Sequence, residues 1–517
     1  MKLVTFIFAS FFLFILTINI SGQSKTYYVA SNGSDSNAGT SIDQPFLSIP
    51  KAYSAAVPGD TIYVRGGTYT LTTTISISKS GTAGSYYYLY AYPGERPILD
   101  FSKMAFGSSN RGIKLSGKYW HIKGFDIKGA GDNGMNISGS YNIVEFCALY
   151  ENQDAGLQLG GGASYNKIIN CDSYYNYDAP NGGGNADGFS PKLDVGTGNY
   201  FYGCRSWQNS DDGWDGYLRG ANDVTTTLEN CWTFKNGFLK DGSNPGTQAN
   251  GNGFKMGGSD DKTLMHNFIL KNCLSFDNKV KGFDQNNNKG SMTLYNCTGF
   301  RNGTYNFSVS SPLNPGKTLT VINCVSLASQ GVTLFGGSTQ QNNTWNQGFS
   351  VSNSDFVSID PTAAYGPRNA DGSLPEIDFM HLVSTSPLVN AGVDVGLPYN
   401  SYAPDLGAFE LGGVVSSVAD YNIAPGQFEL KQNYPNPFNP ATVLSYNLVK
   451  SSHVLLEVYD IRGRKVAQLV DGTQQEGSYN INWIARDSYG SQMPSGIYFA
   501  KLKTDYGMKI IKMALLK

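Results

Sequence analysis

The stretch Val144-Glu-Phe-Cys-Ala-Leu-Tyr-Glu-Asn152 returns, with the same residue types at its key positions, as Ile168-Ile-Asn-Cys-Asp-Ser-Tyr-Tyr-Asn176. Both contain an apolar residue, a cysteine three residues later, an aromatic ring three residues after the cysteine, and then an asparagine. The pattern recurs around five further cysteines and weakens at the last of them: Cys204, Cys231, Cys273, Cys297 and Cys324. Short strand-like repeats spaced by roughly two dozen residues, with no helix between them, are typical of a parallel β-helix.

Equivalent residues of successive coils stack into columns in such a fold, because each coil lies about 4.8 Å above the one before. We therefore expect a buried column of cysteines, a column of aromatic rings, and a ladder of asparagines whose amides bond to one another along the axis. The 7 cysteines are an odd number, so at least one is unpaired. Disulfides between neighbouring coils stay an alternative, because adjacent coils lie within bridging distance.

The rest of the chain divides around these repeats. An apolar run behind a single lysine predicts that residues 1–22 are a signal peptide, and that the mature protein has no membrane span. Residues 23–411 are predicted to form the β-helix domain, in which residues 46–57 form a helix that covers the first coil. We expect the segment 356–411 to cover the other end of the coil.

The C-terminal part of the chain contains no cysteine and reads as a separate unit. Residues 412–424 are interpreted as a linker and residues 425–517 as a small β-sandwich. Five segments of this unit alternate in polarity as strands do: 443–448, 454–460, 479–484, 497–502 and 509–516.

The composition excludes several classes of protein. Charged residues make up 15% of the 517 residues and the formal net charge is −2, so the chain has no basic footprint for a nucleic acid. Its 61 glycines and 33 tyrosines favour a turn-rich all-β protein over a helical or disordered one. With a signal peptide, such a chain is expected to act outside the cytoplasm, and we expect it to be a monomer.

Three motifs share a Gly-aromatic pair: Gly184-Asn-Ala-Asp-Gly-Phe189, Ser210-Asp-Asp-Gly-Trp-Asp-Gly216 and Gly251-Asn-Gly-Phe-Lys-Met-Gly257. The first two contain aspartates and the third contains a lysine. If the Gly-aromatic pair has the same place in each coil, the ring points inward and the next residue points outward. Asp215 and Lys255 are then neighbours in one outward column. Asp187 and Asp212 are neighbours in the column before the glycine, with Asp211 beside them.

Converging carboxylates repel one another, and a bound divalent cation removes the repulsion. Calcium tolerates an irregular cage of carboxylate oxygens best, so we expect a Ca²⁺ site, although aspartate before glycine is also ordinary turn chemistry. Lys255 would elsewhere be a solvated surface group. Here burial and a nearby cation favour its neutral form, while Asp215 opposes that shift, and a neutral amine can abstract a proton. Two insertions in the repeat precede Asp187 and Lys255 and would wall a groove.

Calcium beside a neutral base suits β-elimination from a polymer of uronic acids, in which the base removes the C5 proton and the C4 oxygen leaves. On the two aspartate motifs and the lysine motif, residues 26–411 resemble polysaccharide lyase family 9, the pectate lyases on a right-handed parallel β-helix. The resemblance implies that the substrate is pectate (polygalacturonate) and that Lys255 is the Brønsted base. It implies that four aspartates bind Ca²⁺: Asp187, Asp211, Asp212 and Asp215.

Further features extend this hypothesis to the substrate and to export. Arg219 and Lys192 are candidates for binding other substrate carboxylates, with surface solvation as the alternative. The run Gln432-Asn-Tyr-Pro-Asn-Pro-Phe-Asn-Pro440 and the Lys-rich terminal strand resemble the C-terminal sorting domain of the type IX secretion system. That resemblance implies export across an outer membrane by this machinery, to a secreted or cell-surface location. A carbohydrate-binding β-sandwich is the alternative for this unit.

Two other functions fit the same fold. A hydrolase of the polygalacturonase type needs carboxylates as acid and base on either side of the bond, which Asp211 and Asp212 could mimic. That reading leaves Lys255 without a role. A non-catalytic polysaccharide-binding β-helix would use the carboxylates only for a structural calcium ion. Alginate or another uronan remains open as the substrate.

Overall fold

The computed structural model describes residues 24–346, 348–412, 428–448, 450–460, 464–486, 492–504 and 507–516. The predicted signal peptide and nearly all of the predicted linker lie outside the described residues. Among the helices in these ranges, none combines the length and the apolar character that crossing a bilayer would require.

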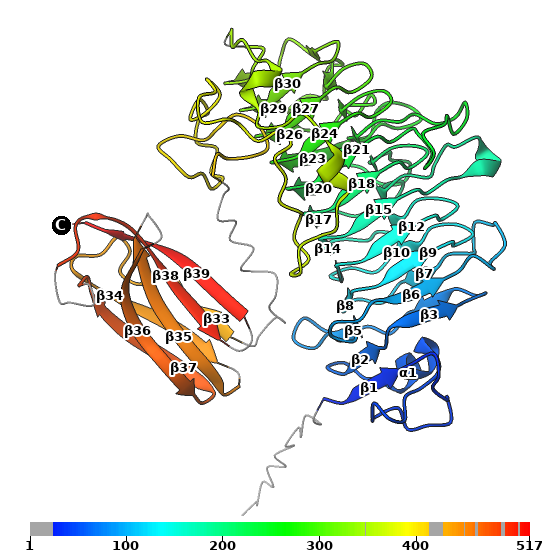
Figure 1. Cartoon of the computed structure of the whole chain (residues 1–517), viewed down its shortest axis with the longest axis horizontal. Coiled ribbons are helices and arrows are strands. Elements are labelled where there is room, and N and C mark those ends of the chain that lie inside the picture. The colour runs from blue at the N-terminus through cyan, green and yellow to red at the C-terminus, as the bar shows by residue number, and fades with distance from the viewer. Residues whose placement is uncertain are drawn as a thin grey trace, which may run out of the picture.

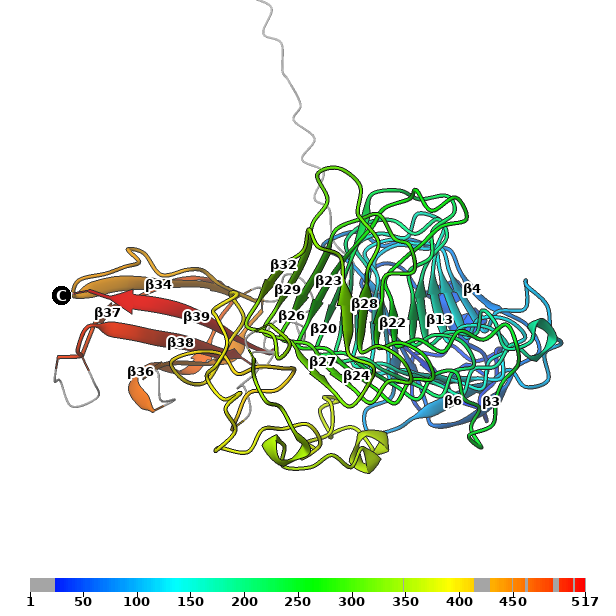
Figure 2. The same ribbon diagram turned by 90° about the horizontal axis from the view of Figure 1, so that it is seen from above.

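Three parallel sheets wind around a common axis and make up the larger domain, a right-handed β-helix (Figure 1). Within the described residues they contain 12, 10 and 10 strands, and we call them the first, second and third sheets. Viewed from above, the strands of each sheet lie side by side in successive coils (Figure 2). The predicted parallel β-helix is therefore confirmed.

The strands are short because each coil turns from one sheet to the next after a few residues. The first sheet consists of β1 (Thr26–Val29), β2 (Thr61–Val64), β5 (Tyr87–Ala91), β8 (Trp120–Lys123), β11 (Ile143–Glu145), β14 (Lys167–Ile169), β17 (Asn199–Tyr202), β20 (Val224–Glu229), β23 (His266–Lys271), β26 (Met292–Tyr295), β29 (Leu319–Ile322) and β32 (Thr339–Gln341). The second sheet consists of β4 (Ile75–Ile77), β7 (Ile113–Leu115), β10 (Met135–Ile137), β13 (Leu157–Leu159), β16 (Phe189–Pro191), β19 (Trp214–Asp215), β22 (Phe254–Lys255), β25 (Phe283–Asp284), β28 (Phe307–Val309) and β31 (Val332–Leu334). The third sheet consists of β3 (Gly67–Thr70), β6 (Pro97–Asp100), β9 (Asp126–Lys128), β12 (Ala148–Tyr150), β15 (Asp172–Tyr174), β18 (Arg205–Trp207), β21 (Trp232–Phe234), β24 (Leu274–Phe276), β27 (Thr298–Phe300) and β30 (Val325–Leu327).

The asparagine ladder forms as predicted. Nδ2 of each asparagine donates to Oδ1 of the next at 2.8 to 3.0 Å, in the order Asn152, Asn176, Asn209, Asn236, Asn278 and Asn302. Asn306 accepts the bond of Asn302 at 2.9 Å, in place of the asparagine that the coil of Cys324 lacks. Because leaving one such buried group unpaired costs about 1–3 kcal/mol, the ladder fixes the register of the coils.

The cysteine and aromatic columns lie on opposite sides of the chain. All seven cysteines fall in the described part of the chain, and they are buried free thiols, so the disulfide alternative is not realised. The aromatic column instead lies on the outer face of the third sheet. Tyr174 and Trp207 stack with ring centroids 4.3 Å apart, and Phe234 and Phe276 with centroids 4.6 Å apart.

Helix α1 (Ile49–Ala55) lies against β1, β2 and β4 at the N-terminal end of the β-helix. It begins after Ser48, whose side chain accepts a hydrogen bond from the backbone of Lys51. It is shorter than the predicted 46–57 because Phe46 pairs with Val29 as a β-bridge. At the other end, the residue before Pro58 is biased away from the helical conformation. Three short 3-10 helices are also described: Ala179–Asn181, Asn353–Asp355 and Thr362–Tyr365.

The segment 356–411 extends along the outer face of the third sheet, whereas we expected it to cover the open end of the coil. Phe379 packs on Phe276 with ring centroids 4.7 Å apart. Arg368 Nη2 donates to Asp172 Oδ1 at 2.7 Å, several coils back along the axis. The physical reason is the aromatic column, because a stripe of large rings on an outer face needs a cover.

The C-terminal domain packs two antiparallel sheets around one apolar core. One sheet contains β33 (Phe428–Leu430), β34 (Ala441–Leu448) and β37 (Gly477–Ile484), and the other contains β35 (Ser452–Asp460), β36 (Lys465–Gln474), β38 (Gly496–Thr504) and β39 (Gly507–Leu515). All five predicted strands are present in this β-sandwich. The sequence reading missed β33 and β36, the latter because Asp471-Gly472 reads as a turn inside the strand.

Candidate active site

The Gly-aromatic motifs align three consecutive strands of the second sheet, β16, β19 and β22. Phe189 pairs with Trp214 and Trp214 with Phe254, and their inward rings lie 4.7 and 5.0 Å apart between centroids. The same register pairs Asp215 with Lys255. The predicted outward column is therefore present, and its two charged residues are neighbours.

The glycine in each motif is required by close packing. At Gly213 a Cβ atom would lie 1.9 Å from Oγ1 of Thr233 and 2.6 Å from the carbonyl oxygen of Gly253. No side chain fits in that space. Glycine at this position therefore lets the backbone pass close to Thr233. The close approach fixes the backbone next to Asp212, the residue before this glycine.

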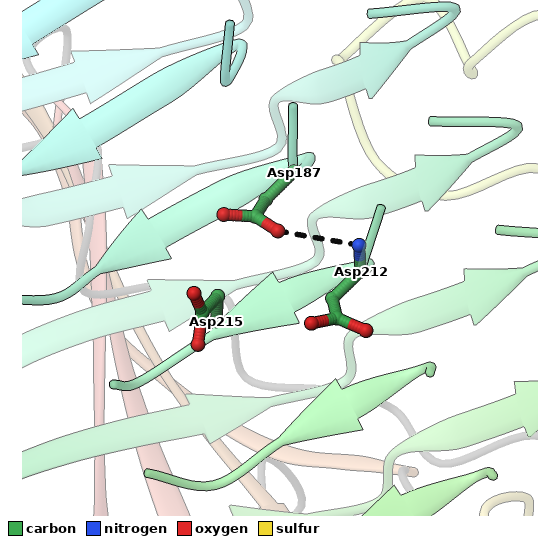
Figure 3. A group of neighbouring side chains, drawn as sticks. All are labelled: Asp187, Asp212 and Asp215. Atoms are coloured by element: carbon green, nitrogen blue, oxygen red, sulfur yellow. Dashed lines mark hydrogen bonds between the residues drawn. The ribbon is translucent and has the colours of Figure 1, made fainter. Parts of the chain in front are cut away.

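Asp187, Asp212 and Asp215 form a buried cluster, which we call the carboxylate triad (Figure 3). Each offers a carboxylate oxygen, and these oxygens lie within 4.8 Å of one another. The backbone N–H of Asp212 donates to Oδ1 of Asp187 at 3.2 Å, and the hydroxyl of Ser190 donates to Oδ2 of Asp187 at 2.8 Å. The backbone and side-chain nitrogens of Asn252 donate to Oδ1 of Asp212 at 2.8 and 2.9 Å. These bonds fix the orientation of two of the three carboxylates.

Two buried lysines contact the triad. Nζ of Lys255 lies 2.9 Å from Oδ2 of Asp212 and 3.4 Å from Oδ1 of Asp215. Nζ of Lys192 lies 2.7 Å from Oδ2 of Asp187 and 3.5 Å from Oδ2 of Asp215. Lys255 is thus placed where the sequence predicts it. Lys192, predicted to bind substrate, here contacts the aspartates of its own chain.

Burial and charge shift the pKa values of this cluster in opposite directions. Burial raises the pKa of Asp187 to about 7, and burial with the neighbouring aspartates raises the pKa of Asp212 well above its usual value. Burial also opposes the ionisation of Asp215, but Lys255 and Lys192 outweigh it and lower the pKa. Burial favours the neutral form of Lys255, yet the surrounding carboxylates outweigh it and raise the pKa well above the usual value. Lys255 is therefore an ammonium ion when the triad holds no cation.

Asp211, the fourth predicted ligand, lies beside the triad and joins two loops to it. Residues 177–187 and 237–252 are the first and second inserted loops, which precede β16 and β22. Oδ2 of Asp211 accepts the backbone N–H of Asn185 at 3.0 Å, and Oδ1 accepts the backbone N–H of Asn250 at 2.6 Å. One carboxylate therefore fastens both loops next to the triad, a role that the sequence reading missed.

Arg219, the other residue predicted to bind substrate, is exposed and does not belong to the buried cluster. Its side chain is 63% exposed and pairs with Asp260, Nε to Oδ2 at 3.1 Å. Asp260 also accepts a hydrogen bond from the hydroxyl of Tyr217 at 2.6 Å. Arg219 therefore belongs to a surface ion pair at the edge of the groove.

A pocket of about 540 Å³ opens over Lys255 and Asp215, the member of the triad that lines it. Its lining residues come from both inserted loops and from the end of the second sheet: Asn181, Gly184, Asn185, Asp211, Asp215, Tyr217, Gln248, Asn250 and Lys255. The sequence reading missed Tyr217, although the alternation that places Asp215 outward also places the residue two positions later outward. The sequence did not predict the amide residues of the loops, because loop side chains do not alternate in direction as strand side chains do.

The triad fits a hard divalent cation. Calcium–oxygen distances of about 2.3–2.6 Å allow two ligand oxygens to lie about 5 Å apart, and the oxygens of the triad lie within 4.8 Å. Oδ2 of Asp212 is buried and has an ion pair with Lys255 but no hydrogen bond. With Asp211, four carboxylates face two ammonium groups, so a divalent cation would balance the charge of the site.

Comparison with known proteins gives consistent matches for the larger domain. Residues 27–323 match the family model described as Pel9A-like, right handed beta helix region. The chain is 40% identical over 406 residues to pectate lyase L of Dickeya chrysanthemi, covering 76% of this chain and 92% of that protein. It is 33% identical over 400 residues to pectate lyase PEL9 of Emericella nidulans, covering 72% and 94%.

Solved structures and a second family model add to these matches. The crystal structure of pectate lyase Pel9A is 38% identical, with a TM-score of 0.70 over 75% of this chain and 96% of that chain. A rhamnogalacturonan lyase is 28% identical, with a TM-score of 0.61 over 70% and 97%. Residues 441–507 match the FlgD Ig-like domain model. From the first of these family models and the lyase relatives, the chain belongs to the Pel9A-like right-handed β-helix family and is a polysaccharide lyase.

Proposed function

We propose that this protein is a calcium-dependent pectate lyase that cleaves polygalacturonate by β-elimination, with Lys255 as the base. One observation carries the proposal. Nζ of Lys255 lies 2.9 Å from a carboxylate triad suited to a hard cation, and it lines an open pocket. The names of the relatives support pectate as the substrate.

Asp187, Asp212 and Asp215 would hold the Ca²⁺ ion, with Asp211 as a fourth ligand. Each oxygen of Asp211 accepts one N–H and keeps a second lone pair. A Ca²⁺ ion bound here would supply positive charge for the substrate carboxylate, and so favour the anion formed next to it at C5.

Lys255 performs the proton transfer in this proposal. Its neutral Nζ accepts the proton from C5, and the electrons of the C5–H bond form the double bond between C4 and C5. The C4–O bond breaks, and its electrons leave with the glycosidic oxygen, which takes a proton from solvent. One product therefore carries an unsaturated sugar, and no water molecule is consumed.

The charge of Lys255 depends on what the carboxylates are bound to. In the cation-free site the surrounding aspartates raise its pKa, so the side chain is an ammonium ion and cannot accept a proton. A divalent cation on the same carboxylates offsets their negative charge and reduces this effect. The proposed metal site and the proposed base therefore depend on each other.

Lys192 and Arg219 stay candidates for binding substrate carboxylates, in different ways. Arg219 lies at the surface in an exposed pair with Asp260, and such a pair is weak enough to exchange partners. Lys192 contacts Asp187 and Asp215, so it would meet a substrate carboxylate only at the triad itself. Its contacts also orient both aspartates for a cation.

An assay on polygalacturonate separates the possible functions. We expect purified protein to raise the ultraviolet absorbance of unsaturated chain ends, and a chelator to abolish the rise. New reducing ends without absorbance would indicate a hydrolase, and tight binding without products would indicate a binding protein. Elimination from rhamnogalacturonan or alginate but not from polygalacturonate would leave the reaction in place and move the substrate to another uronan.

The N-terminal and C-terminal segments extend the proposal to export. We infer that residues 1–22 direct export and that residues 425–517 are a sorting domain of the type IX secretion system, giving a secreted or cell-surface monomer. The antiparallel β-sandwich and the Tyr434–Pro440 run support this reading. A reporter placed between residues 1–22 and residues 425–517 should leave a cell that has this machinery and stay inside one that lacks it. Retention in both would remove the sorting role and favour a carbohydrate-binding domain.

A further inference from the structure

The two inserted loops contact each other over the pocket and form a single wall. The backbone N–H of Gln248 donates to the carbonyl oxygen of Gly182 at 3.2 Å. The hydroxyl of Tyr177 donates to the carbonyl oxygen of Pro245 at 3.2 Å. The fit is close, because a Cβ atom at Gly246 would lie 2.2 Å from the carbonyl oxygen of Gly182.

Hydrogen bonds hold the wall to Ser210 and Asp211, the two residues that precede Asp212 of the triad. Asp211 accepts one backbone N–H from each loop, and the hydroxyl of Ser210 donates to the carbonyl oxygen of Gly183 at 2.7 Å. Both residues directly precede Asp212 in the chain. The position of the wall relative to the triad is therefore set by short hydrogen bonds to a buried turn.

The face that the wall presents to the pocket consists of neutral amides. Asp178 is buried, and its Oδ2 accepts from Nδ2 of Asn181 at 2.7 Å and from Nδ2 of Asn185 at 3.2 Å. Because a carboxylate only accepts, the side-chain oxygens of these two asparagines are left as acceptors for the pocket. Gln248 and Asn250 line the same pocket, and their side-chain amides make no hydrogen bond to described residues.

The groups that line the pocket could bind a second sugar unit, next to the one at the triad. The triad and Lys255 provide the charged floor, which in the proposed function acts on one uronate. The wall adds acceptors for hydroxyl groups from the first loop, and donors for a hydroxyl or a carboxylate oxygen from Gln248 and Asn250. A pocket of about 540 Å³ is of the size in which small ligands or short sugar segments bind.

We propose that the wall is a subsite for the uronate unit next to the one at the triad, and that Gln248 and Asn250 are its specificity-determining residues. The inference rests on the proposed function, because it takes the ligand to be a uronate chain. Asp211 acts on this subsite as a positioning residue through its bonds to both loops.

The test uses Gln248→Ala and Asn250→Ala in the full chain. Each is expected to raise KM for polygalacturonate about tenfold, the equivalent of one hydrogen bond to a charged group, with kcat and the calcium requirement unchanged. Thr247→Ala is the matched control, because Thr247 directly precedes Gln248 in the same loop, is exposed and does not line the pocket. Tyr177→Phe, which removes a bond between the loops without touching the pocket, should raise KM by a smaller factor.

Direct binding separates this inference from the proposed function. Calorimetry with tetragalacturonate in the Lys255→Ala background, where turnover is expected to be about a thousandfold slower, should show the same tenfold loss of affinity for both amide variants. Unchanged affinity and unchanged KM would overturn the subsite. Absence of polygalacturonate cleavage by the wild-type protein would instead overturn the proposed function, and the calorimetric comparison would still decide whether the wall binds uronates.

Discussion

Lys255→Ala is expected to lower kcat on polygalacturonate by about a thousandfold, while the variant still folds and still binds calcium. A general base contributes roughly 10²–10⁴ to the rate. The other buried lysine that contacts the triad, Lys192, pairs with Asp187 and Asp215 and does not line the pocket. The measurement is the initial rate of ultraviolet absorbance increase. Circular dichroism and calcium calorimetry show whether the variant is otherwise intact.

Two further variants decide whether Lys255 acts as a base or only balances charge. Lys255→Arg keeps a positive charge beside Asp212, but the guanidinium does not lose its proton, so we expect the variant to be as inactive as Lys255→Ala. Lys281→Ala removes a lysine from the next coil that pairs with Asp284 at 2.9 Å, and should keep normal activity. Activity in Lys255→Arg close to that of the wild type would show that charge alone is needed.

Asp212→Asn is expected to lower kcat/KM by at least about a hundredfold, because several kcal/mol of cation-based stabilisation are lost. Asp212 occupies the centre of the site, where it accepts two hydrogen bonds from Asn252 and contacts Lys255. Asparagine keeps the shape and one acceptor oxygen but removes the negative charge. Calcium at 100 times its Kd should stabilise the wild-type protein by about 2.7 kcal/mol, and we expect this effect to disappear in the variant.

Thermal unfolding with and without calcium measures that difference independently of activity. Asp277→Asn is the control, because Asp277 pairs with Arg301 at 2.6 Å away from the triad and should leave the calcium effect intact. Calcium but not magnesium should restore the chelated wild type, since magnesium demands a near-octahedral set of ligands. An undiminished calcium shift in Asp212→Asn would remove Asp212 from the metal site.

The β-helix and the core of the site could be predicted from the sequence because they depend on a repeated register. Once one coil was aligned on its cysteine and its asparagine, the strand period placed Asp215 beside Lys255 and Asp187 beside Asp212. The same reasoning predicted the bonded amides of the asparagine ladder. The same reasoning favoured free, buried cysteines over disulfides, since packing alone accounts for their column.

Features outside that register could not be predicted in the same way. The direction of segment 356–411 depends on which surface most needs a cover, and the aromatic face of the third sheet provided it. The sequence did not predict that Lys192 contacts Asp187, because this ion pair depends on how the two side chains are buried together. The strand β36 was missed because its Asp471-Gly472 step looks like a turn when its partner strand is not known.

Residue types and their spacing were enough to define the coil, its columns and the meeting of aspartates with Lys255, because backbone hydrogen bonds repeat the same geometry in every turn. Folding in three dimensions decided how the loops are used. Asp211 joins two loops that are far apart in the chain, and Gln248 and Asn250 come to line the pocket only because the loops contact each other. Such contacts have no period, so they depend on the closure of particular loops and on the packing of particular side chains.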